Sequence, residues 1–516
     1  MLFDTLIQLK KKMPSVFLFL ERQRVQIIIF LISFIILLPG LYNPLQTDEA
    51  YTYLHFAAKG PVYIFGLYNV PNNHILHSLL VWFFSFFGKN IILLRITAFL
   101  SALGIIQVFY MLLKKLTANS LFSALSIFFL VFSSLFYTYS YEARGYSLSN
   151  FLILLALYSY IRFEETQAKK FLYFTGLFSS LAVATLPTSI WMLIGFWIAI
   201  IIKKDILISD KIKYTFFNGI IIVVFYVSAM IYILLNPSSF IVKRLSNDSM
   251  RPSFFQYYLF NILDPIKSFQ VMIVFLFSTI GMMRFKYRNP VAFAILSLIV
   301  CSYFIKVGFL RNYSFLIPLL YLLAAVGLWY LLDLLKFKNI HKYAACILIV
   351  LLFLSQSFSA FKRNIWSVKI DYAKEMSQYA NTYFASDDHY YLLIHSTQVE
   401  YFTDLTIRKK FEETKRIPLS SGVEKATLLL RNNPIFRKFL NLIPELRHRE
   451  RTDFIDINDS ADYYLIILNG PNLENRIMSA FHYYGYAENK ILLSNWAIQH
   501  MNERYLLVRC HLSLRK

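Results

Sequence analysis

Long apolar runs recur along the first 362 residues of this sequence. Each run has roughly 16 to 23 residues, enough for an α-helix to cross a bilayer core of about 30 Å. Hydrophobic residues make up 57% of the chain, which excludes an ordinary soluble globular protein. The sequence therefore predicts a polytopic α-helical membrane protein. We expect eleven spans, at residues 25–42, 90–113, 120–139, 146–162, 171–186, 188–202, 215–235, 267–283, 291–307, 312–332 and 342–361.

The loops between these runs differ in charge. Lys and Arg gather in short cytoplasmic loops of membrane proteins, and here every even-numbered loop is basic. We therefore expect a cytoplasmic N-terminus and an extracytoplasmic chain beyond the last span, in a protein integral to the cell membrane. The basic positions are Lys10–Lys12 with Arg22 and Arg24, Lys114–Lys115, Lys169–Lys170, Lys203–Lys204 with Lys211 and Lys213, Arg284 with Lys286 and Arg288, and Lys336 with Lys338 and Lys342.

The net charge of +22 follows the same division of the chain. Residues 1–362 carry +19 of it and residues 363–516 carry +3. This distribution fits anchoring on anionic membrane lipids and gives no reason to expect a nucleic-acid partner. Cys301, Cys346 and Cys510 show no CxxC or Cys/His spacing, so neither a disulfide framework nor a structural zinc site is predicted.

Two domains are expected. Residues 1–362 form the membrane domain, with long external loops at 43–89 and 236–266, and residues 363–516 form a small extracytoplasmic α/β domain. We find no Gly-rich phosphate loop in the second domain. Its predicted elements are an amphipathic helix over 370–384, strands at 390–395 and 462–470, a helix over 472–484 and a strand at 504–510.

The first external loop opens with adjacent carboxylates, Asp48 and Glu49. In one interpretation Thr47 caps a helix whose first turn holds both carboxylates near the positive end of the helix dipole. In the other, Asp48, Tyr51, Thr52 and His55 share one helix face that points at a site. A partly desolvated carboxylate there could act as a general base.

A polar stretch follows in the same loop. His74 and His77 are three residues apart, directly after Asn72 and Asn73. They are either satisfied loop histidines or part of a divalent-metal site, which needs a third ligand from Asp48, Glu49 or His55. The metal hypothesis takes His74, His55 and Glu49 as ligands, and no other cofactor is predicted. The aromatic residues 81–88 predict a helix lying in the membrane interface.

Two arginines lie on the predicted outer side. Arg144 follows Glu142 in the "YEARGY" loop between the third and fourth spans, and Arg311 precedes the tenth span. A guanidinium can bind phosphate oxygens in a bidentate way. The alternatives are a local ion pair between Arg144 and Glu142 and, for Arg311, a side chain that extends to the membrane surface.

These groups together suit the attack of a hydroxyl or amine on an activated sugar whose leaving group is a phosphate. Asp48 would accept the proton of the acceptor, and Arg144 and Arg311 would stabilise the departing phosphate. The outer side of a membrane offers no pool of nucleotide sugars, so a lipid-linked donor is expected.

Several motifs follow one another along residues 25–335. They are "TDEAYTY", "PNNHILHSLLVWFFSFFG", "LLRITAFLSALGIIQVFYMLLKKL", "YEARGYSLSNFLILLALYSYIRF" and "RNYSFLIPLLYLLAAVG". Their order resembles the GT-C superfamily of membrane glycosyltransferases, and within it the protein O-mannosyltransferase and lipid A aminoarabinose-transferase group. The resemblance implies a polyprenyl-phosphate-linked donor and an inverting transfer without a nucleotide cofactor. It places the acidic motif at Asp48 and Glu49, with Asp48 as base, and the later motifs at Glu142 to Arg144 and at Arg311.

Other functions remain open at this stage. A transporter or flippase for a lipid-linked or anionic solute is the main alternative, although such proteins usually carry ionisable or broken segments near mid-membrane. An oligosaccharide polymerase or ligase would use the same donors, and a non-catalytic relative would only bind glycolipid. The sequence leaves open the sugar and whether the acceptor is a lipid, a glycan or a protein.

Overall fold

A computed structural model describes most of the chain in two compact units. Unit 1 comprises Met1–Asn43, His74–Val227 and Arg244–Ser367, and unit 2 comprises Pro44–Asn73, Ser228–Lys243 and Val368–Lys516. The second unit therefore combines the C-terminal part of the chain with the first half of the predicted external loop and with a segment that begins at Ser228, near the end of a helix that otherwise belongs to unit 1. The residues described are 14–66, 73–235, 269–304, 314–365, 371–383, 391–394, 397–403, 461–469, 472–477 and 491–514.

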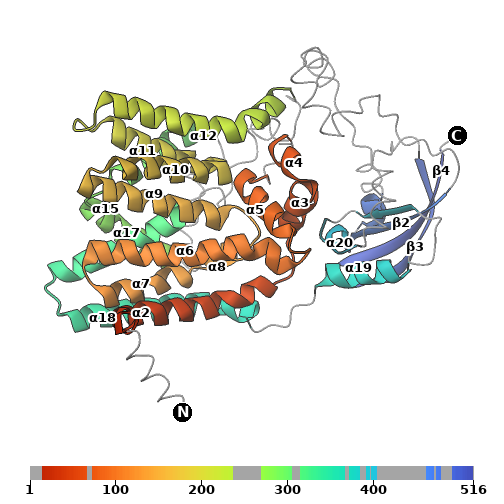
Figure 1. Ribbon diagram of the computed structural model, residues 1–516. Coiled ribbons are helices and arrows are strands. Elements are labelled where there is room, and N and C mark those ends of the chain that lie inside the picture. The colour runs from red at the N-terminus through yellow and green to blue at the C-terminus, as the bar shows by residue number, and fades with distance from the viewer. Residues whose placement is uncertain are drawn as a thin grey trace. The chain divides into compact units, whose positions relative to one another are not determined.

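Unit 1 is a bundle of helices, and each of the eleven predicted spans coincides with helix (Figure 1). The number that cross the membrane stays a prediction. The helices in these positions are α2 (Pro14–Leu37) with η1 (Leu38–Tyr42), α6 (Ile91–Thr117), α7 (Ser120–Val131) with α8 (Ser134–Tyr139), α9 (Tyr146–Thr166), α10 (Lys169–Thr185), η3 (Pro187–Ser189) with α11 (Ile190–Ile201), α12 (Ile208–Leu235), α15 (Phe269–Arg284), α16 (Asn289–Phe304), α17 (Leu316–Leu334) and α18 (Asn339–Ile365).

The third predicted span is not one continuous helix. It divides after α7, and Ser133 caps the short α8 by accepting a hydrogen bond from the backbone N–H of Phe136 at 3.4 Å. A serine oxygen that caps a helix start replaces a carbonyl of the preceding turn, so the chain can change direction here. After this break, α8 leads directly into the "YEARGY" loop.

Apolar surface on unit 1 fits a membrane environment. Phe216 on α12 and Leu348 on α18 are both 69% exposed. Large exposed apolar side chains in such number are costly in water and stable in lipid. Within the described part of the chain, four helices are long and apolar enough to cross a bilayer, namely Arg24–Tyr42, Ile91–Thr117, Ile208–Ile231 and Leu316–Leu334. The protein is accordingly an integral membrane protein.

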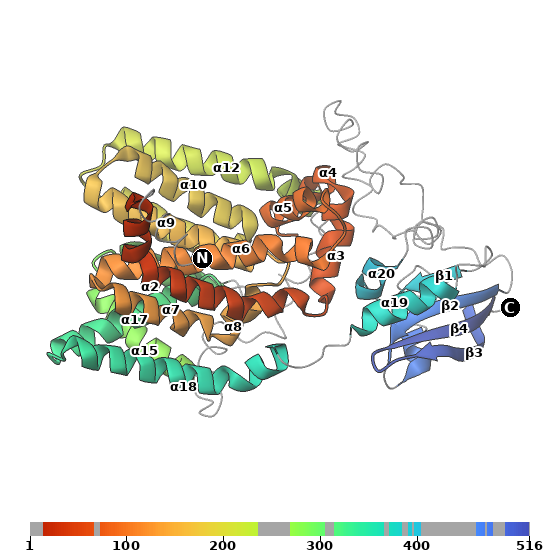
Figure 2. The ribbon, with the colours of Figure 1, turned by 60° about the horizontal axis from the view of Figure 1, so that its bottom comes forward.

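The helices of unit 1 pack in an order that differs from the order of the sequence. α6 lies beside α9, and α9 beside α10, in both views of the molecule (Figures 1 and 2). α15 packs on α17, where a Cβ added to Gly327 would lie only 1.9 Å from the carbonyl oxygen of Phe277. Small residues let membrane helices approach closely, so glycine is required at this crossing.

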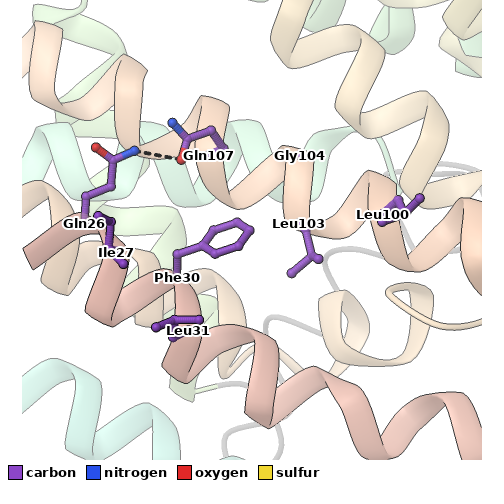
Figure 3. Close-up of a pocket in the computed structure, with 8 residues that line it drawn as sticks. All are labelled: Gln26, Ile27, Phe30, Leu31, Leu100, Leu103, Gly104 and Gln107. Carbon is purple, nitrogen blue, oxygen red and sulfur yellow. Dashed lines mark hydrogen bonds between the residues drawn. The ribbon is translucent and has the colours of Figure 1, made fainter. Parts of the chain in front are cut away.

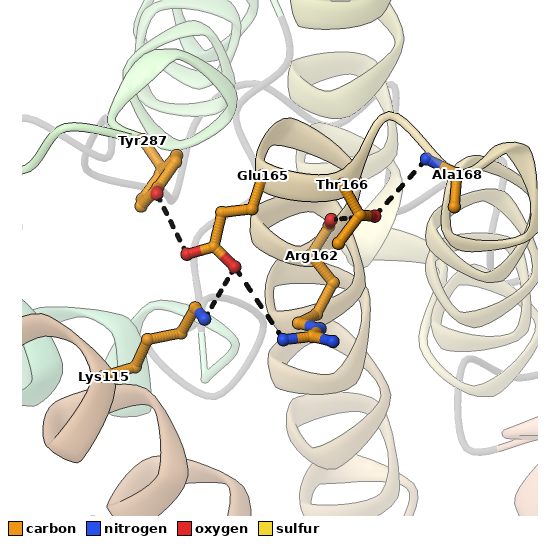
Figure 4. Close-up of polar contacts among 6 residues, drawn as sticks. All are labelled: Lys115, Arg162, Glu165, Thr166, Ala168 and Tyr287. Atoms are coloured by element: carbon orange, nitrogen blue, oxygen red, sulfur yellow. Dashed lines mark hydrogen bonds and ion pairs between the residues drawn. The ribbon is translucent and has the colours of Figure 1, made fainter.

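Polar contacts join several of the basic loops of unit 1, and Figure 4 shows those that Glu165 makes with Lys115, Arg162 and Tyr287. Glu165 at the end of α9 accepts from Lys115 at 2.6 Å and from the hydroxyl of Tyr287 at 3.2 Å. Lys203 pairs with Glu164 at 2.8 Å. Burial favours the protonated acid, but the hydrogen bond and charge of Lys115 hold the pKa of Glu165 below its ordinary value. The ends of spans two, four, six and eight therefore share a side, as the charge pattern requires.

Unit 2 contains a four-stranded mixed sheet in the order β1-β2-β4-β3, built from β1 (Tyr391–Ile394), β2 (Ala461–Leu468), β3 (Ile491–Met501) and β4 (Tyr505–Leu514). β1 and β2 are parallel, and the other pairs are antiparallel. The sequence pattern did not predict β3. Its pairing with β4 shifts register near Asn495 and again near His500, and such irregularities interrupt the alternation of apolar residues that identifies a strand.

Two helices pack against this sheet. α19 (Tyr372–Tyr383) confirms the amphipathic helix predicted at 370–384, and α20 (Thr397–Phe402) lies beside it. Met376 of α19 and Val399 of α20 share a buried cluster with Ile466, Tyr505 and Leu507 of the sheet. The predicted helix at 472–484 is described over 473–477, where it is helical.

Short helices from the first external loop complete the two units. α3 (Thr47–His55), η2 (Ala57–Lys59) and α4 (Pro61–Gly66) belong to unit 2. α5 (Ile75–Ser85) belongs to unit 1 and packs on α6 and α10. The long predicted loop at 43–89 is therefore helical over most of the part that the structure describes.

Candidate active site

The acidic motif forms the first turn of α3 in unit 2. Gln46, not Thr47, is the N-cap, so the predicted cap was wrong by one residue. Gln46 and Glu49 form a capping box, in which the Gln46 backbone N–H donates to Glu49 Oε2 at 2.8 Å. Glu49 is 1% exposed. Its carboxylate is thus used to start the helix, which assigns it a structural part.

Asp48 is half-buried, unlike Glu49. Tyr51 and His55 follow on the same side of α3 and are also half-buried, with ring centroids 4.1 Å apart. Thr52 is buried, and its hydroxyl donates to the carbonyl oxygen of Asp48 at 2.9 Å. The helix face predicted from sequence therefore presents Asp48, Tyr51 and His55, while Thr52 belongs to the interior of the unit.

Asn73 is fully buried in unit 2. Its side-chain amide donates to the carbonyl oxygen of Ile64 on α4 at 2.7 Å. An amide that donates to a buried carbonyl oxygen stabilises the local backbone, so this hydrogen bond ties Asn73 to the end of α4.

His74 belongs to a buried polar cluster of unit 1, which also contains His77, Arg144 and Tyr146. Its Nδ1 lies 3.2 Å from the carbonyl oxygen of Thr185 at the end of α10, and its ring meets Tyr146 edge to face with centroids 5.5 Å apart. Both His74 and Tyr146 are 2% exposed. His74, directly before α5, thus contacts the start of α9 through Tyr146 and the end of α10 through Thr185.

Arg144 lies in the turn between α8 and α9. Its guanidinium carbon is 4.9 Å from the centroid of the Tyr146 ring, and the residue is 5% exposed. The Arg144 backbone N–H donates to the carbonyl oxygen of Glu142 at 2.6 Å, so the turn is tight. A Cβ on the neighbouring Gly145 would lie 2.7 Å from Thr185 Cγ2, which explains why this turn needs glycine. Arg144, Tyr146 and His74 are thereby held together.

His77 is the second histidine of this cluster. It is 0% exposed and lies near the carbonyl group of Ala143 and the charge of Arg144. Burial lowers the pKa of His77 to about 4, and the positive charge of Arg144 acts in the same direction. The imidazole is therefore neutral at pH 7, and Arg144 supplies a positive charge beside it.

Arg95 is a buried charge that was not predicted from the sequence. It is 0% exposed near the N-terminus of α6, and its Nη1 donates to the carbonyl oxygens of Leu41 at 3.2 Å and Asn43 at 2.6 Å. Carbonyl groups at the end of α2 and η1 carry the negative end of the helix dipole, which a guanidinium neutralises. Its position within the apolar run 90–113 is the sequence feature from which a buried charge could have been predicted.

The metal hypothesis gains no support. Among the residues that the structure describes, no three His, Cys, Asp or Glu side chains form a group that could hold a metal ion. Glu49, one of its three ligands, is occupied by the capping box. Arg311 lies outside the described residues.

Each unit contains a pocket formed by residues that the structure describes. In unit 1 a largely apolar groove of about 460 Å³ lies between α2 and α6, with Phe30 and Leu103 facing it and a Gln26–Gln107 hydrogen bond of 2.8 Å at one end (Figure 3). In unit 2 a pocket of about 330 Å³ adjoins the chain before α3. It is lined by Pro44, Leu45, Asp371, Tyr372, Ala373, Gln398, Glu503 and Arg504.

The described residues define an α-helical membrane protein that also has a unit built on a small mixed sheet. The fold is similar to that of ArnT from Cupriavidus metallidurans. The structure of ArnT bound to undecaprenyl phosphate matches with a TM-score of 0.59 and 10% identity, over 94% of this chain and 98% of that one. Apo ArnT matches with a TM-score of 0.56 and 11% identity, over 94% and 97%. No family model and no curated protein matches the sequence.

Proposed function

We propose that this protein is an inverting glycosyltransferase that moves a sugar from a polyprenyl-phosphate-linked donor to an acceptor on the outer face of the membrane. The observation that carries the proposal is the likeness in fold, over nearly the full length of both chains, to an ArnT that binds undecaprenyl phosphate. The acceptor bears a hydroxyl or amine on a lipid, a glycan or a protein. The N-terminus is cytoplasmic in this proposal.

Arg144 binds the phosphate of the donor in the proposed reaction. Its guanidinium is held in one orientation by the ring of Tyr146 and by the tight turn that begins at Glu142. A guanidinium fixed in this way loses little freedom when it binds two phosphate oxygens. The neutral His77 beside it adds no second charge. Arg311 is assigned to the same phosphate from its sequence position alone.

Asp48 is the general base. It is half-buried in the first turn of α3, whereas the neighbouring Glu49 is buried and fixed in the capping box. The two carboxylates of the motif thus have different surroundings, and only Asp48 retains partial exposure. Tyr51 and His55 on the same side of the helix are the residues that would adjoin the acceptor.

In the proposed transfer one bond forms at the anomeric carbon and another breaks there. The acceptor oxygen or nitrogen forms a bond to the anomeric carbon of the sugar, and its proton passes to the Asp48 carboxylate. The bond between the anomeric carbon and the phosphate oxygen breaks, and its electron pair leaves with the polyprenyl phosphate. Arg144 stabilises the charge that develops on that phosphate.

The decisive experiment compares wild type with Asp48→Asn in liposomes that contain labelled undecaprenyl-phosphate-sugars and an envelope extract. We expect loss of transfer with donor binding retained. Asp205→Asn is the matched control, because Asp205 is an exposed carboxylate that pairs with Lys203 at 3.5 Å. Normal transfer by Asp48→Asn would reject Asp48 as the base. Movement of labelled lipid across the bilayer without any transfer would favour a transporter.

A further inference from the structure

A buried chain of hydrogen bonds links the sheet of unit 2 to the acidic helix. The hydroxyl of Tyr505, the first residue of β4, donates to Gln398 Oε1 at 2.7 Å. Gln398 Nε2 in turn donates to the carbonyl oxygen of Leu45 at 2.5 Å. All three residues are at most 4% exposed. Both ends of the Gln398 amide are therefore satisfied inside the unit.

A second contact joins α20 directly to α3. Tyr53 of α3 meets Tyr401 of α20 edge to face, with ring centroids 5.3 Å apart. Both rings are largely buried, and α3 packs on α20. Edge-to-face aromatic pairs favour one geometry over others, so this contact fixes the rotation of α3.

The hydrogen bond from Gln398 to Leu45 lies close enough to Asp48 in the sequence to affect its position. Leu45 directly precedes Gln46, the N-cap of α3, and Asp48 is the third residue after Leu45. A fixed carbonyl at Leu45 thus sets where the helix starts and in which direction its first turn points. No side chain of the C-terminal part needs to reach Asp48 to control its position.

We propose that Gln398 is a positioning residue, through which the C-terminal sheet holds the helix that carries Asp48. In this proposal the C-terminal part of the chain contributes to sugar transfer by keeping Asp48 in position. The effect on catalysis rests on the proposed function, but the mechanical link between Gln398 and α3 does not. The two can therefore be tested apart.

Amide hydrogen exchange on the full-length protein in detergent tests the link. Gln398→Leu removes both hydrogen bonds at similar volume, and we expect exchange at residues 47–56 to rise about tenfold or more while β2 and β4 keep their protection. Gln378→Leu makes the same change at an exposed position of α19 and should have no effect. Unchanged exchange at 47–56 would overturn the proposal, and so would an equal rise across the sheet.

Two further variants keep the test open if Gln398→Leu does not fold. Tyr505→Phe removes only the donor to Gln398 Oε1 and should raise the same exchange by less. Gln398→Glu gives an ionised carboxylate that cannot donate to Leu45, whereas the protonated acid can. We therefore expect the protection of amides 47–56, compared with that of wild type at the same pH, to be lower at pH 8 and to recover towards pH 5. The absence of both effects would contradict the link.

Transfer assays then connect the link to catalysis. Gln398→Leu should lower kcat about tenfold or more and leave the KM for the donor unchanged, because the donor phosphate is assigned to Arg144. Faster exchange at 47–56 with an unchanged kcat would reject the positioning role while keeping the link. If wild type transfers no sugar, the proposed function fails and the exchange result still stands.

Discussion

Arg95 lies over the ring of Tyr141, with its guanidinium carbon 5.4 Å from the ring centroid. The Tyr141 ring also leaves no space for a side chain at Gly40, because a Cβ there would lie 2.3 Å from Tyr141 Cδ1. Arg95 therefore joins the end of α2 and η1 to the "YEARGY" turn. The chain leaves this junction at Asn43, directly before unit 2 begins at Pro44.

Replacing Arg95 should destabilise unit 1. Arg95→Met keeps the length of the side chain but leaves the carbonyl groups of Leu41 and Asn43 without this donor. Loss of charged, buried hydrogen bonds costs about 2–4 kcal/mol, so thermal unfolding in detergent should begin several degrees below that of wild type. Arg162→Met is the control, because the Arg162 side chain is 37% exposed and its ion pair with Glu165 is 4.0 Å long. Equal midpoints for both variants would contradict this role of Arg95.

Replacing Arg144 should affect the donor more than the acceptor. Arg144→Lys keeps the charge but loses the planar fork that binds two oxygens and stacks on Tyr146. We expect the KM for the polyprenyl-phosphate donor to rise about 10- to 100-fold, the equivalent of a charge-assisted hydrogen bond. Initial rates at varied donor concentrations measure this.

The acceptor provides the internal control for Arg144→Lys. The KM for the acceptor should stay within about twofold of wild type. If acceptor KM rises and donor KM does not, Arg144 belongs to the acceptor site and the assignment of the phosphate is wrong.

Most of the helical architecture could be predicted, because apolar runs and basic loops depend on local composition. Each predicted span coincides with helix, and the ion pairs of Glu165 and Lys203 join the loops that charge had placed together. The site was predictable only in part. Arg144 and His74 were proposed as site residues from their motifs, and that assignment stays a prediction, whereas their contacts with Tyr146 and Thr185 depend on helix packing.

The long-range contacts had no signal in the sequence. Gln398 lies 353 residues from Leu45, and nothing in its surroundings marks it as more than a polar residue on a short helix. The cap of α3 was wrong by one residue because a glutamine cap is uncommon, whereas Thr47 has the expected residue type. Tertiary partners decide such positions.

The two carboxylates of the acidic motif should respond differently to amide substitution. Glu49→Gln keeps an oxygen that accepts from the Gln46 backbone N–H, so the capping box and transfer should both survive. Glu49→Ala removes the box and should lower thermal stability by about 1 kcal/mol. Transfer and thermal unfolding of the two variants check this. Loss of transfer in folded Glu49→Gln would make Glu49 a catalytic residue.

The neutral His77 should make the protein sensitive to acid. The pKa of His77 in the folded state, about 4, lies below the ordinary value of 6.5, so the unfolded chain binds the proton more readily. Stability from this group is fully present above about pH 6.5, falls as the pH drops to about 4, and changes no further below it. The loss amounts to about 3 kcal/mol, since one pKa unit corresponds to 1.36 kcal/mol.

Thermal unfolding of unit 1 between pH 7.5 and pH 4.5 measures this effect. His77→Gln preserves a polar side chain of similar size that does not titrate, so its midpoint should fall less on acidification than that of wild type. His341→Gln, at an exposed position in α18, should keep the acid loss of wild type because His77 is intact. If His77→Gln loses stability in acid as steeply as wild type, other groups cause the loss, and the neutral state of His77 beside Arg144 has no measurable cost. A shallower slope would show that the polar cluster is built around an uncharged imidazole, which leaves the positive charge of the cluster to Arg144.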